Sequence, residues 1–147
     1  MKILVLNDQS TLPLTVRTVK ALVRAVVVLE GERVDEVSIS FLDAAGIGQV
    51  HAAYFNDPSP TDCISIPLDA DRRHGHRVLG DVIVCPAVAV AYAAKRNKCP
   101  RMEVSLYLVH GLLHLFGYDD IEPIARRKMR AAERRHMRHL QEQGLLL

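Results

Sequence analysis

Two histidines and a later aspartate stand at spacings that suit a metal ion. His110 and His114 are four residues apart, so on a helix their side chains lie one above the other on the same face. Gly117 tolerates the left-handed backbone conformation that commonly ends helices, and Asp120 follows the expected turn. Two histidines and one carboxylate are a known ligand set for catalytic zinc, which keeps a fourth position for water. We therefore predict one divalent transition metal ion, Zn²⁺ before others, held by His110, His114 and Asp120.

The histidines need a helix that places them at the centre of the fold. Apolar residues surround them on most faces of a predicted helix that begins at Pro100, so we expect this helix to be buried. A chain of 147 residues with a net charge of +2 suits a single domain, residues 1–147, with its own apolar core. Because such a domain can fold without a metal, we expect a bound metal to serve function and not folding.

Short or alternating apolar runs predict strands, and longer apolar runs, several entered through proline, predict helices. The strands are expected at residues 2–6, 35–42, 61–66 and 79–84, and the helices at 13–29, 43–54, 86–97, 100–116 and 122–143. These elements predict an α+β fold in which a small mixed sheet of about four strands packs with about five helices.

Cysteine usage and hydropathy limit the class of protein. The cysteines are odd in number and form no C-x-x-C pair, so neither a disulfide framework nor a zinc knuckle is supported. No apolar run reaches the roughly 18 residues of a membrane span, and the N-terminal apolar run meets polar Asn7 too soon for a signal peptide. We expect a cytoplasmic protein without a membrane partner.

Three stretches resemble the YbeY family, bacterial metal-dependent endoribonucleases linked to ribosomal RNA maturation. Residues 110–120, HGLLHLFGYDD, are similar to the family pattern H-G-x-L-H-L-x-G-Y-D-H. Residues 60–67, PTDCISIP, resemble P-T-D-V-L-S-F-P, and residues 79–84, LGDVIV, resemble L-G-D-I-V-I. The resemblance implies a single-strand-specific endoribonuclease that acts in 3′-end maturation of 16S ribosomal RNA and in ribosome quality control. The implied partners are ribosomal RNA, the small ribosomal subunit and an assembly GTPase.

Carried over by position, His110 and His114 match the first two metal ligands of the family and act in catalysis through the metal-bound water. The third ligand of the family is usually histidine, whereas this chain has Asp120, an oxygen donor that still completes a zinc site. Such an ion lowers the pKa of its water to about 7 and polarises a phosphoryl oxygen. Phosphodiester hydrolysis needs both effects.

The chain departs from the family at an arginine implicated in catalysis or phosphate contact. The family has tyrosine followed by arginine shortly before the matched T-D, and this chain has Tyr54 followed by Phe55. A nearby family asparagine is replaced by His51. Either another cation takes the place of the missing guanidinium, or activity toward RNA is altered. The candidate cations are Arg72, Arg73 and Arg77.

Other polar residues are candidates for supporting roles. Ligating imidazoles usually donate their second N–H to a carboxylate or carbonyl, and the acidic candidates are Asp62, Asp81 and Asp119, each with a structural alternative as a turn cap. Ser65 is a candidate for phosphate contact. Residues 122–142 carry a net charge of +4, which suits contact with phosphates but also suits a solvated helix face. The RNA-binding candidates there are Arg126, Arg127, Arg130 and Arg134.

Three other functions compete with the nuclease. A zinc peptidase shares the ligand spacing, but such enzymes place a general-base glutamate after the first histidine, where this chain has Gly111. A ribosome-associated assembly factor with a structural metal and little nuclease activity would explain the missing arginine. A non-haem iron site also uses two histidines and a carboxylate, but the sequence shows no cosubstrate pocket.

Overall fold

The computed structural model describes residues 1–68 and 75–147. Four strands of this part form one sheet in the order β1-β2-β4-β3, with β1, β2 and β4 parallel and β3 antiparallel to β4. Their bounds are Lys2–Asp8 for β1, Glu36–Leu42 for β2, Cys63–Pro67 for β3 and Val78–Val84 for β4. The predicted mixed sheet is therefore confirmed.

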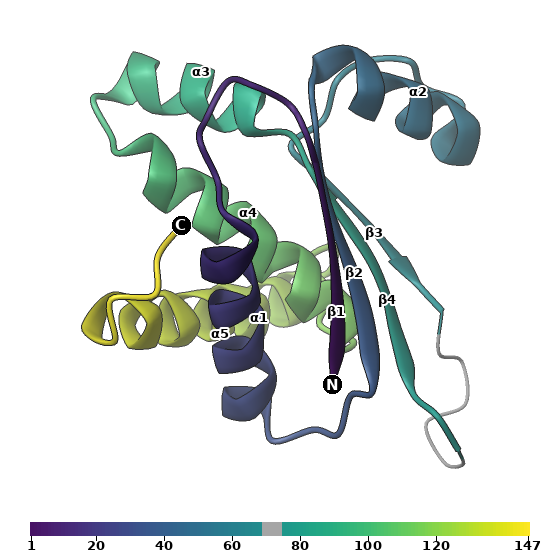
Figure 1. The fold of residues 1–147 in the computed structure, drawn as a ribbon, viewed down its shortest axis with the longest axis vertical. Coiled ribbons are helices and arrows are strands. Elements are labelled where there is room, and N and C mark those ends of the chain that lie inside the picture. Colours follow the sequence, from purple (N-terminus) through teal and green to yellow (C-terminus); the bar gives the residue numbers. More distant parts are fainter. Residues whose placement is uncertain (69–74) are drawn as a thin grey trace.

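Helices cover the two faces of the sheet unequally. Three helices, α1, α4 and α5, lie on one side of the sheet, α3 packs against α4, and α2 lies on the other side (Figure 1). Their bounds are Val16–Glu30 for α1, Ala44–Phe55 for α2, Pro86–Arg96 for α3, Pro100–Leu115 for α4 and Pro123–Glu142 for α5. The main core lies between the sheet and α1, α4 and α5, and the α+β class predicted from the sequence is confirmed.

Local capping explains most helix ends. Asp43 caps α2 by accepting a hydrogen bond from the Gly46 N–H at 2.7 Å. Gly31 ends α1 with a φ of 70°, a left-handed conformation that glycine adopts at little cost. The predicted start of α1 near Pro13 is wrong. Thr15 caps this helix, accepting from the Thr18 N–H at 3.1 Å, so the proline lies outside it.

The histidine helix α4 rests directly on the sheet. A Cβ at Gly111 would stand 2.5 Å from Cγ1 of Val82 and 2.8 Å from Sγ of Cys63. The side chains of Leu108 and Leu112, on either side of this glycine, are fully buried. Close contact with β3 and β4 therefore fixes the depth and rotation of the turn that carries both histidines.

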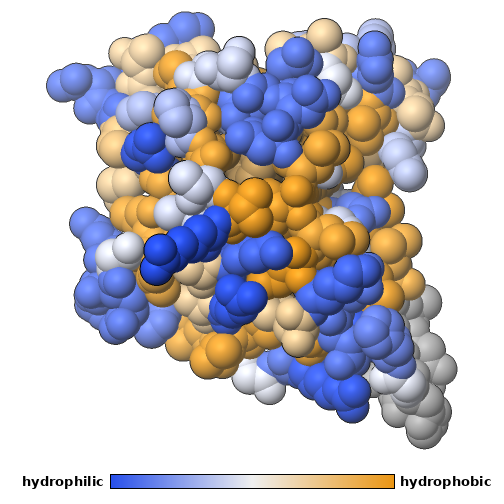
Figure 2. Space-filling model, in the orientation of Figure 1, coloured by the Kyte–Doolittle hydropathy of each residue, from blue (hydrophilic) through white to orange (hydrophobic). Residues whose placement is uncertain are grey.

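One face of the molecule exposes apolar side chains near its middle (Figure 2). Leu4 and Leu6 of β1 are 43% and 55% exposed, on the face of the sheet opposite the core. None of the described helices is both long enough and apolar enough to cross a membrane.

Candidate metal centre

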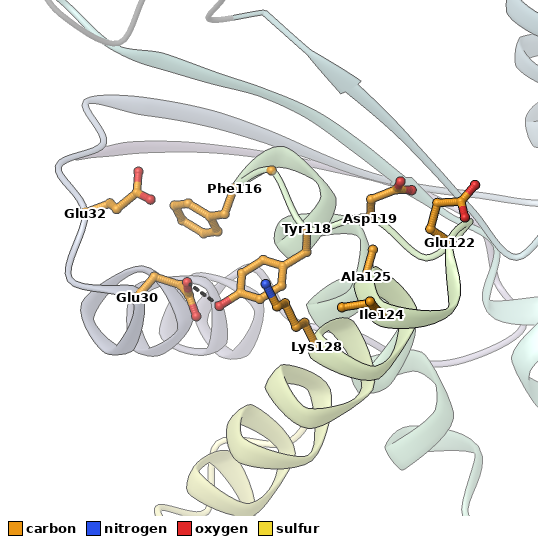
Figure 3. Close-up of a pocket in the computed structure, with 10 residues that line it drawn as sticks. Glu30, Glu32, Phe116, Tyr118, Asp119, Glu122, Ile124, Ala125 and Lys128 are labelled. Atoms are coloured by element: carbon orange, nitrogen blue, oxygen red, sulfur yellow. Dashed lines mark hydrogen bonds between the residues drawn. The ribbon is translucent and has the colours of Figure 1, made fainter.

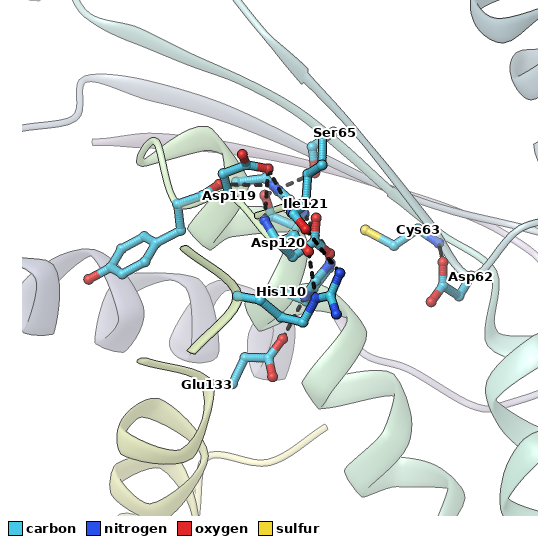
Figure 4. A network of polar contacts seen from close by, with 12 residues as sticks. Asp62, Cys63, Ser65, His110, Asp119, Asp120, Ile121 and Glu133 are labelled. Carbon is cyan, nitrogen blue, oxygen red and sulfur yellow. Dashed lines mark hydrogen bonds and ion pairs between the residues drawn. The ribbon is translucent and has the colours of Figure 1, made fainter. Parts of the chain in front are cut away.

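The structure brings together the three residues proposed as metal ligands. The Nε2 atoms of His110 and His114 are 3.0 Å apart, and Oδ2 of Asp120 lies 3.5 Å from the first and 3.7 Å from the second. One ligand atom from each residue falls within 4.8 Å of the others. Figure 4 shows His110 and Asp120 facing each other in this cluster. The spacing thus forms a small, half-buried group of donors.

A glycine turn carries the chain from the histidine helix to Asp120. Gly117 has a φ of 98°, as predicted for the residue after the helix end. Its N–H donates to the His114 carbonyl at 3.0 Å, and the Tyr118 N–H donates to the Leu113 carbonyl at 3.1 Å. This pair of bonds is the Schellman motif, which satisfies helix carbonyls while the chain reverses direction. The reversal brings Asp120 back over the histidines.

The outer nitrogens of both histidines are held by hydrogen bonds. Nδ1 of His110 lies 2.6 Å from Oε1 of Glu133 on α5, and Nδ1 of His114 lies 3.0 Å from the Tyr118 carbonyl oxygen. Both partners are acceptors, so each Nδ1 carries a proton, and a ring without a second proton presents a lone pair at Nε2 to the other ring. Two lone pairs 3.0 Å apart repel unless a cation lies between them. The donor set therefore fits a divalent ion.

Burial and the neighbouring charges act in opposite directions on the pKa of His110. Burial disfavours its protonated form, but the hydrogen bond and charge of Glu133, together with the charges of Asp120 and Asp62, outweigh burial and raise its pKa. The same carboxylates that favour a proton here also favour a metal cation. The electrostatic environment is thus suited to positive charge.

A second polar cluster lies behind Tyr118. Glu30, 8% exposed, accepts hydrogen bonds from the Tyr118 hydroxyl at 3.2 Å and from Arg135 and His136 at 2.6 Å each. Figure 3 shows Glu30 and Tyr118 at the wall of a cavity of about 630 Å³, which does not include the metal ligands. Burial lowers the pKa of His136 despite the opposing effect of Glu30. The cluster fixes the residue whose carbonyl orients His114.

The loop that bears Asp120 is braced from two sides. Arg126 donates from Nε to the Asp120 carbonyl and from Nη2 to the Ile121 carbonyl, both at 2.9 Å. Asp119 accepts from the Asp120 N–H at 2.7 Å and from the Ile121 N–H at 3.2 Å. The structure therefore places Arg126 and Asp119 in the support of the loop, near the metal ligands but not among them.

His110 and His114, but not Asp120, line a cavity of about 350 Å³. His51 and Phe55 of α2 line it together with both histidines, and Phe55 is 58% exposed. The residue that replaces the family arginine thus stands at the wall of the metal cavity. Arg77 instead contacts Glu32 at 2.7 Å and the Arg33 carbonyl at 2.7 Å. Arg72 and Arg73 lie outside the described residues.

The remaining candidates divide between the two faces of the sheet. Ser65 donates to the Gly111 carbonyl at 2.9 Å, which ties β3 to the histidine helix. Asp62 accepts from the Cys63 N–H at 2.7 Å and lies at the start of β3. Asp81 lines a separate cavity with Leu4 and Leu6, on the face of the sheet away from α4. Of these residues, Asp62 and Ser65 lie on the side of the metal site.

Glu133 is the functional contact that sequence reasoning missed. It lies on α5, far along the chain from His110, in a segment that attracts attention only by its arginines. The one available signal was a lone glutamate in the middle of a basic helix. A carboxylate there has cations as near neighbours on its helix, yet its contact to His110 at 2.6 Å depends on the docking of α5.

The site has the features of a metal-dependent hydrolase. Two imidazoles on a central helix face each other, a turn brings a carboxylate back to them, and a cavity adjoins them. Residues 4–141 match the family model described as Endoribonuclease YbeY. The chain therefore belongs to the YbeY family of metal-dependent endoribonucleases.

Individual relatives agree with the family match. An endoribonuclease YbeY of Protochlamydia amoebophila is 45% identical over 141 residues, 96% of this chain and 94% of the relative. One from Chlamydia felis is 36% identical and covers 100% of this chain and 96% of its own length. The solution structure of TM1509 from Thermotoga maritima has a TM-score of 0.68 at 20% identity, covering 97% of this chain and 91% of that one. The last comparison supports the fold.

Proposed function

We propose that this protein is a zinc-dependent endoribonuclease that cleaves single-stranded RNA in 3′-end maturation of 16S ribosomal RNA and in ribosome quality control. Its proposed partners are the small ribosomal subunit and an assembly GTPase, and its proposed location is the cytoplasm. The observation that carries the nuclease proposal is the pair of Nε2 atoms 3.0 Å apart at an open cavity. Membership of the family supports RNA as the substrate.

The side chains prepare this site for phosphodiester hydrolysis. A divalent ion bound there would supply a water with a pKa of about 7 and an electrophile for a phosphoryl oxygen. Glu133 and the Tyr118 carbonyl hold each imidazole in the tautomer that presents Nε2. Asp120 adds an oxygen donor on the exposed side, where its side chain is 42% accessible. The cavity beside the two histidines leaves room for substrate.

Arginines of α5 provide a surface for the RNA backbone. Because Glu133 reaches His110, the side of α5 that bears Glu133 faces the metal site. Arg130 lies one turn before Glu133, Arg134 one turn after Arg130, and both are exposed. Arg126 is committed to the loop by its hydrogen bonds, whereas Arg127, also exposed, lies two turns before Arg134 on the same side of the helix. We propose that Arg127, Arg130 and Arg134 contact phosphates of the bound strand.

The packing of Gly111 opposes the peptidase alternative. A glutamate after the first histidine would place its Cβ within 2.5 Å of Val82. Phe55 favours a second candidate function, an assembly factor with a structural metal and little nuclease activity, because an aromatic ring stands at the cavity wall where the family arginine is expected.

Metal binding is tested first. Protein purified without a His-tag should contain near-stoichiometric metal by elemental analysis, and His114→Ala should lose it. Occupancy should fall as the pH drops through about 6, because ligating imidazoles must be neutral. A wild-type protein free of metal after dialysis against Zn²⁺ would contradict the site.

RNA cleavage is tested with structured ribosomal RNA that contains single-stranded segments. Wild-type protein should cleave it, and chelator or His110→Ala should abolish cleavage. Cleavage that persists in His110→Ala would indicate a contaminating nuclease. A wild-type protein that binds metal stoichiometrically but cleaves no RNA would favour the assembly-factor function.

A further inference from the structure

An aromatic and cationic surface lies at the end of α3, outside the metal ligands and their supports. The Arg96 guanidinium carbon lies 3.8 Å from the centroid of the Tyr92 ring, and the Lys98 ammonium lies 5.7 Å from the same centroid. Tyr92 is half-buried, whereas Arg96 and Lys98 are exposed. The guanidinium carbon stands over the ring, and Arg96 is exposed, so a ligand can approach the guanidinium from solvent.

Tyr107 links this surface to the metal centre. It lies three residues before His110 on α4, so the two side chains share one side of the helix, separated along its axis by about 4.5 Å. The charge of Asp62 raises the pKa of both Tyr107 and His110, and Tyr92 and Arg96 also influence the pKa of Tyr107. Helix α3 packs on α4. Tyr107 therefore lies between the metal ligands and the Tyr92–Arg96 pair.

The charges of this surface favour an anionic strand. In the described part of the chain, none of its four cations has an ion-pair partner, and the two carboxylates nearby are Asp62 and Glu103. Burial raises the pKa of Tyr107 to about 12, so its hydroxyl remains a hydrogen-bond donor. Bases of single-stranded RNA stack on aromatic rings and on guanidinium planes. The cations are Lys95, Arg96, Lys98 and Arg101.

We propose that Tyr92, Arg96 and Tyr107 form a subsite for the single-stranded RNA that flanks the cleaved bond. A base stacks on the outer face of Arg96, which Tyr92 supports from behind, and Lys98 contacts the adjoining phosphate. Tyr107 donates a hydrogen bond to the nucleotide between this base and the metal centre. This inference rests on the proposed RNA-cleaving function and assigns one end of its substrate path to α3.

The subsite is tested on the full chain with a fluorescent single-stranded RNA of about 12 nucleotides. Its binding is measured by fluorescence anisotropy in the presence of chelator. Arg96→Lys keeps the charge but removes the flat stacking surface, and it should weaken binding about 5-fold or more with an unchanged salt dependence. Arg96→Gln should weaken binding further and reduce the salt slope by about one. Tyr92→Leu should resemble Arg96→Lys. Arg24→Gln, an exposed charge change on α1, is the matched control and should bind as wild type.

Cleavage assays separate failure of the subsite from failure of the function. With the metal restored, Arg96→Lys should lose more activity on the longer strand than on a dinucleotide, which is too short to span the subsite. If wild type cleaves the longer strand and both Arg96→Lys and Tyr92→Leu bind and cleave it equally well, the subsite is wrong and the function stands. If Arg24→Gln weakens RNA binding as much as Arg96→Gln does, the subsite is also wrong, because general electrostatic attraction would then account for the binding. If wild type neither binds nor cleaves RNA, the function itself fails.

Discussion

Removing the charge of Glu133 should weaken metal binding without touching a metal ligand. Its carboxylate lies 2.6 Å from Nδ1 of His110, and the two side chains are only 20% and 26% exposed. Loss of such an outer partner typically costs 10- to 100-fold in metal affinity. In Glu133→Gln the amide oxygen still accepts the Nδ1 proton, so the tautomer survives and only the charge is lost. We expect about a 10-fold loss, or about 1.4 kcal/mol.

Glu133→Ala should cost more, because it removes both the charge and the acceptor that orients the ring. We expect a loss toward 100-fold, about 2.7 kcal/mol. Affinity is measured by competition with a chromophoric chelator at about pH 8, where protons compete little for imidazole. Near pH 6 the loss in Glu133→Gln should shrink, because Glu133 also raises the pKa of His110 and its removal weakens the competing proton.

Glu142→Gln is the matched control, since Glu142 ends α5, is exposed and makes the same charge change away from the histidines. Equal affinity in Glu133→Gln, Glu133→Ala and wild type would refute the assigned role of the carboxylate. So would an equal loss in Glu142→Gln, which would mean that overall charge and not the contact to His110 sets the affinity. Thermal melts of the metal-free variants establish that each is folded.

Gly111→Ala should lower the free energy of unfolding by about 1–3 kcal/mol in urea titrations, because its Cβ would overlap Val82; wild-type stability would disprove the close packing. For His136, burial lowers the pKa below the unfolded value of 6.5, so its contribution is present above that pH and is lost on acidification. Wild type should therefore lose stability between about pH 7 and 5 more steeply than His136→Gln, and parallel curves would contradict this. Phe55→Arg should raise the RNA cleavage rate by placing a cation at the cavity wall; an unchanged rate would mean that the site needs no cation there.

Local rules account for the part of the site that the sequence predicts. The spacing of His110 and His114 and the left-handed tolerance of Gly117 are properties of one helix and its end, and the structure has both. The supporting role predicted for Asp81 is wrong, and alternation along the strand explains why: Gly80 and Val82 on either side of it face α4, so Asp81 faces away from the histidines. These features depend on neighbours in the chain.

Contacts between distant elements account for the rest. Glu133 and Glu30 gain their roles only when α5 and α1 dock, and neither lies in a local pattern that marks it. The position of Phe55 at the cavity wall depends on how α2 sits beside β3 and α4. Pro13 led to a wrong start for α1, because a proline is equally compatible with the extended chain before a helix and with the first turn of the helix.

The arrangement of ligands also has a kinetic consequence for folding. All three ligands lie within residues 110–120, so bringing them together closes only a short loop and costs little chain entropy. Glu133, which holds Nδ1 of His110, belongs to a helix that must dock from elsewhere. An ion that binds these three ligands would therefore meet them before α5 docks, and docking would slow its escape. By mass action such an ion would stabilise the native chain, which would couple the yield of folded protein to the metal supply of the cell.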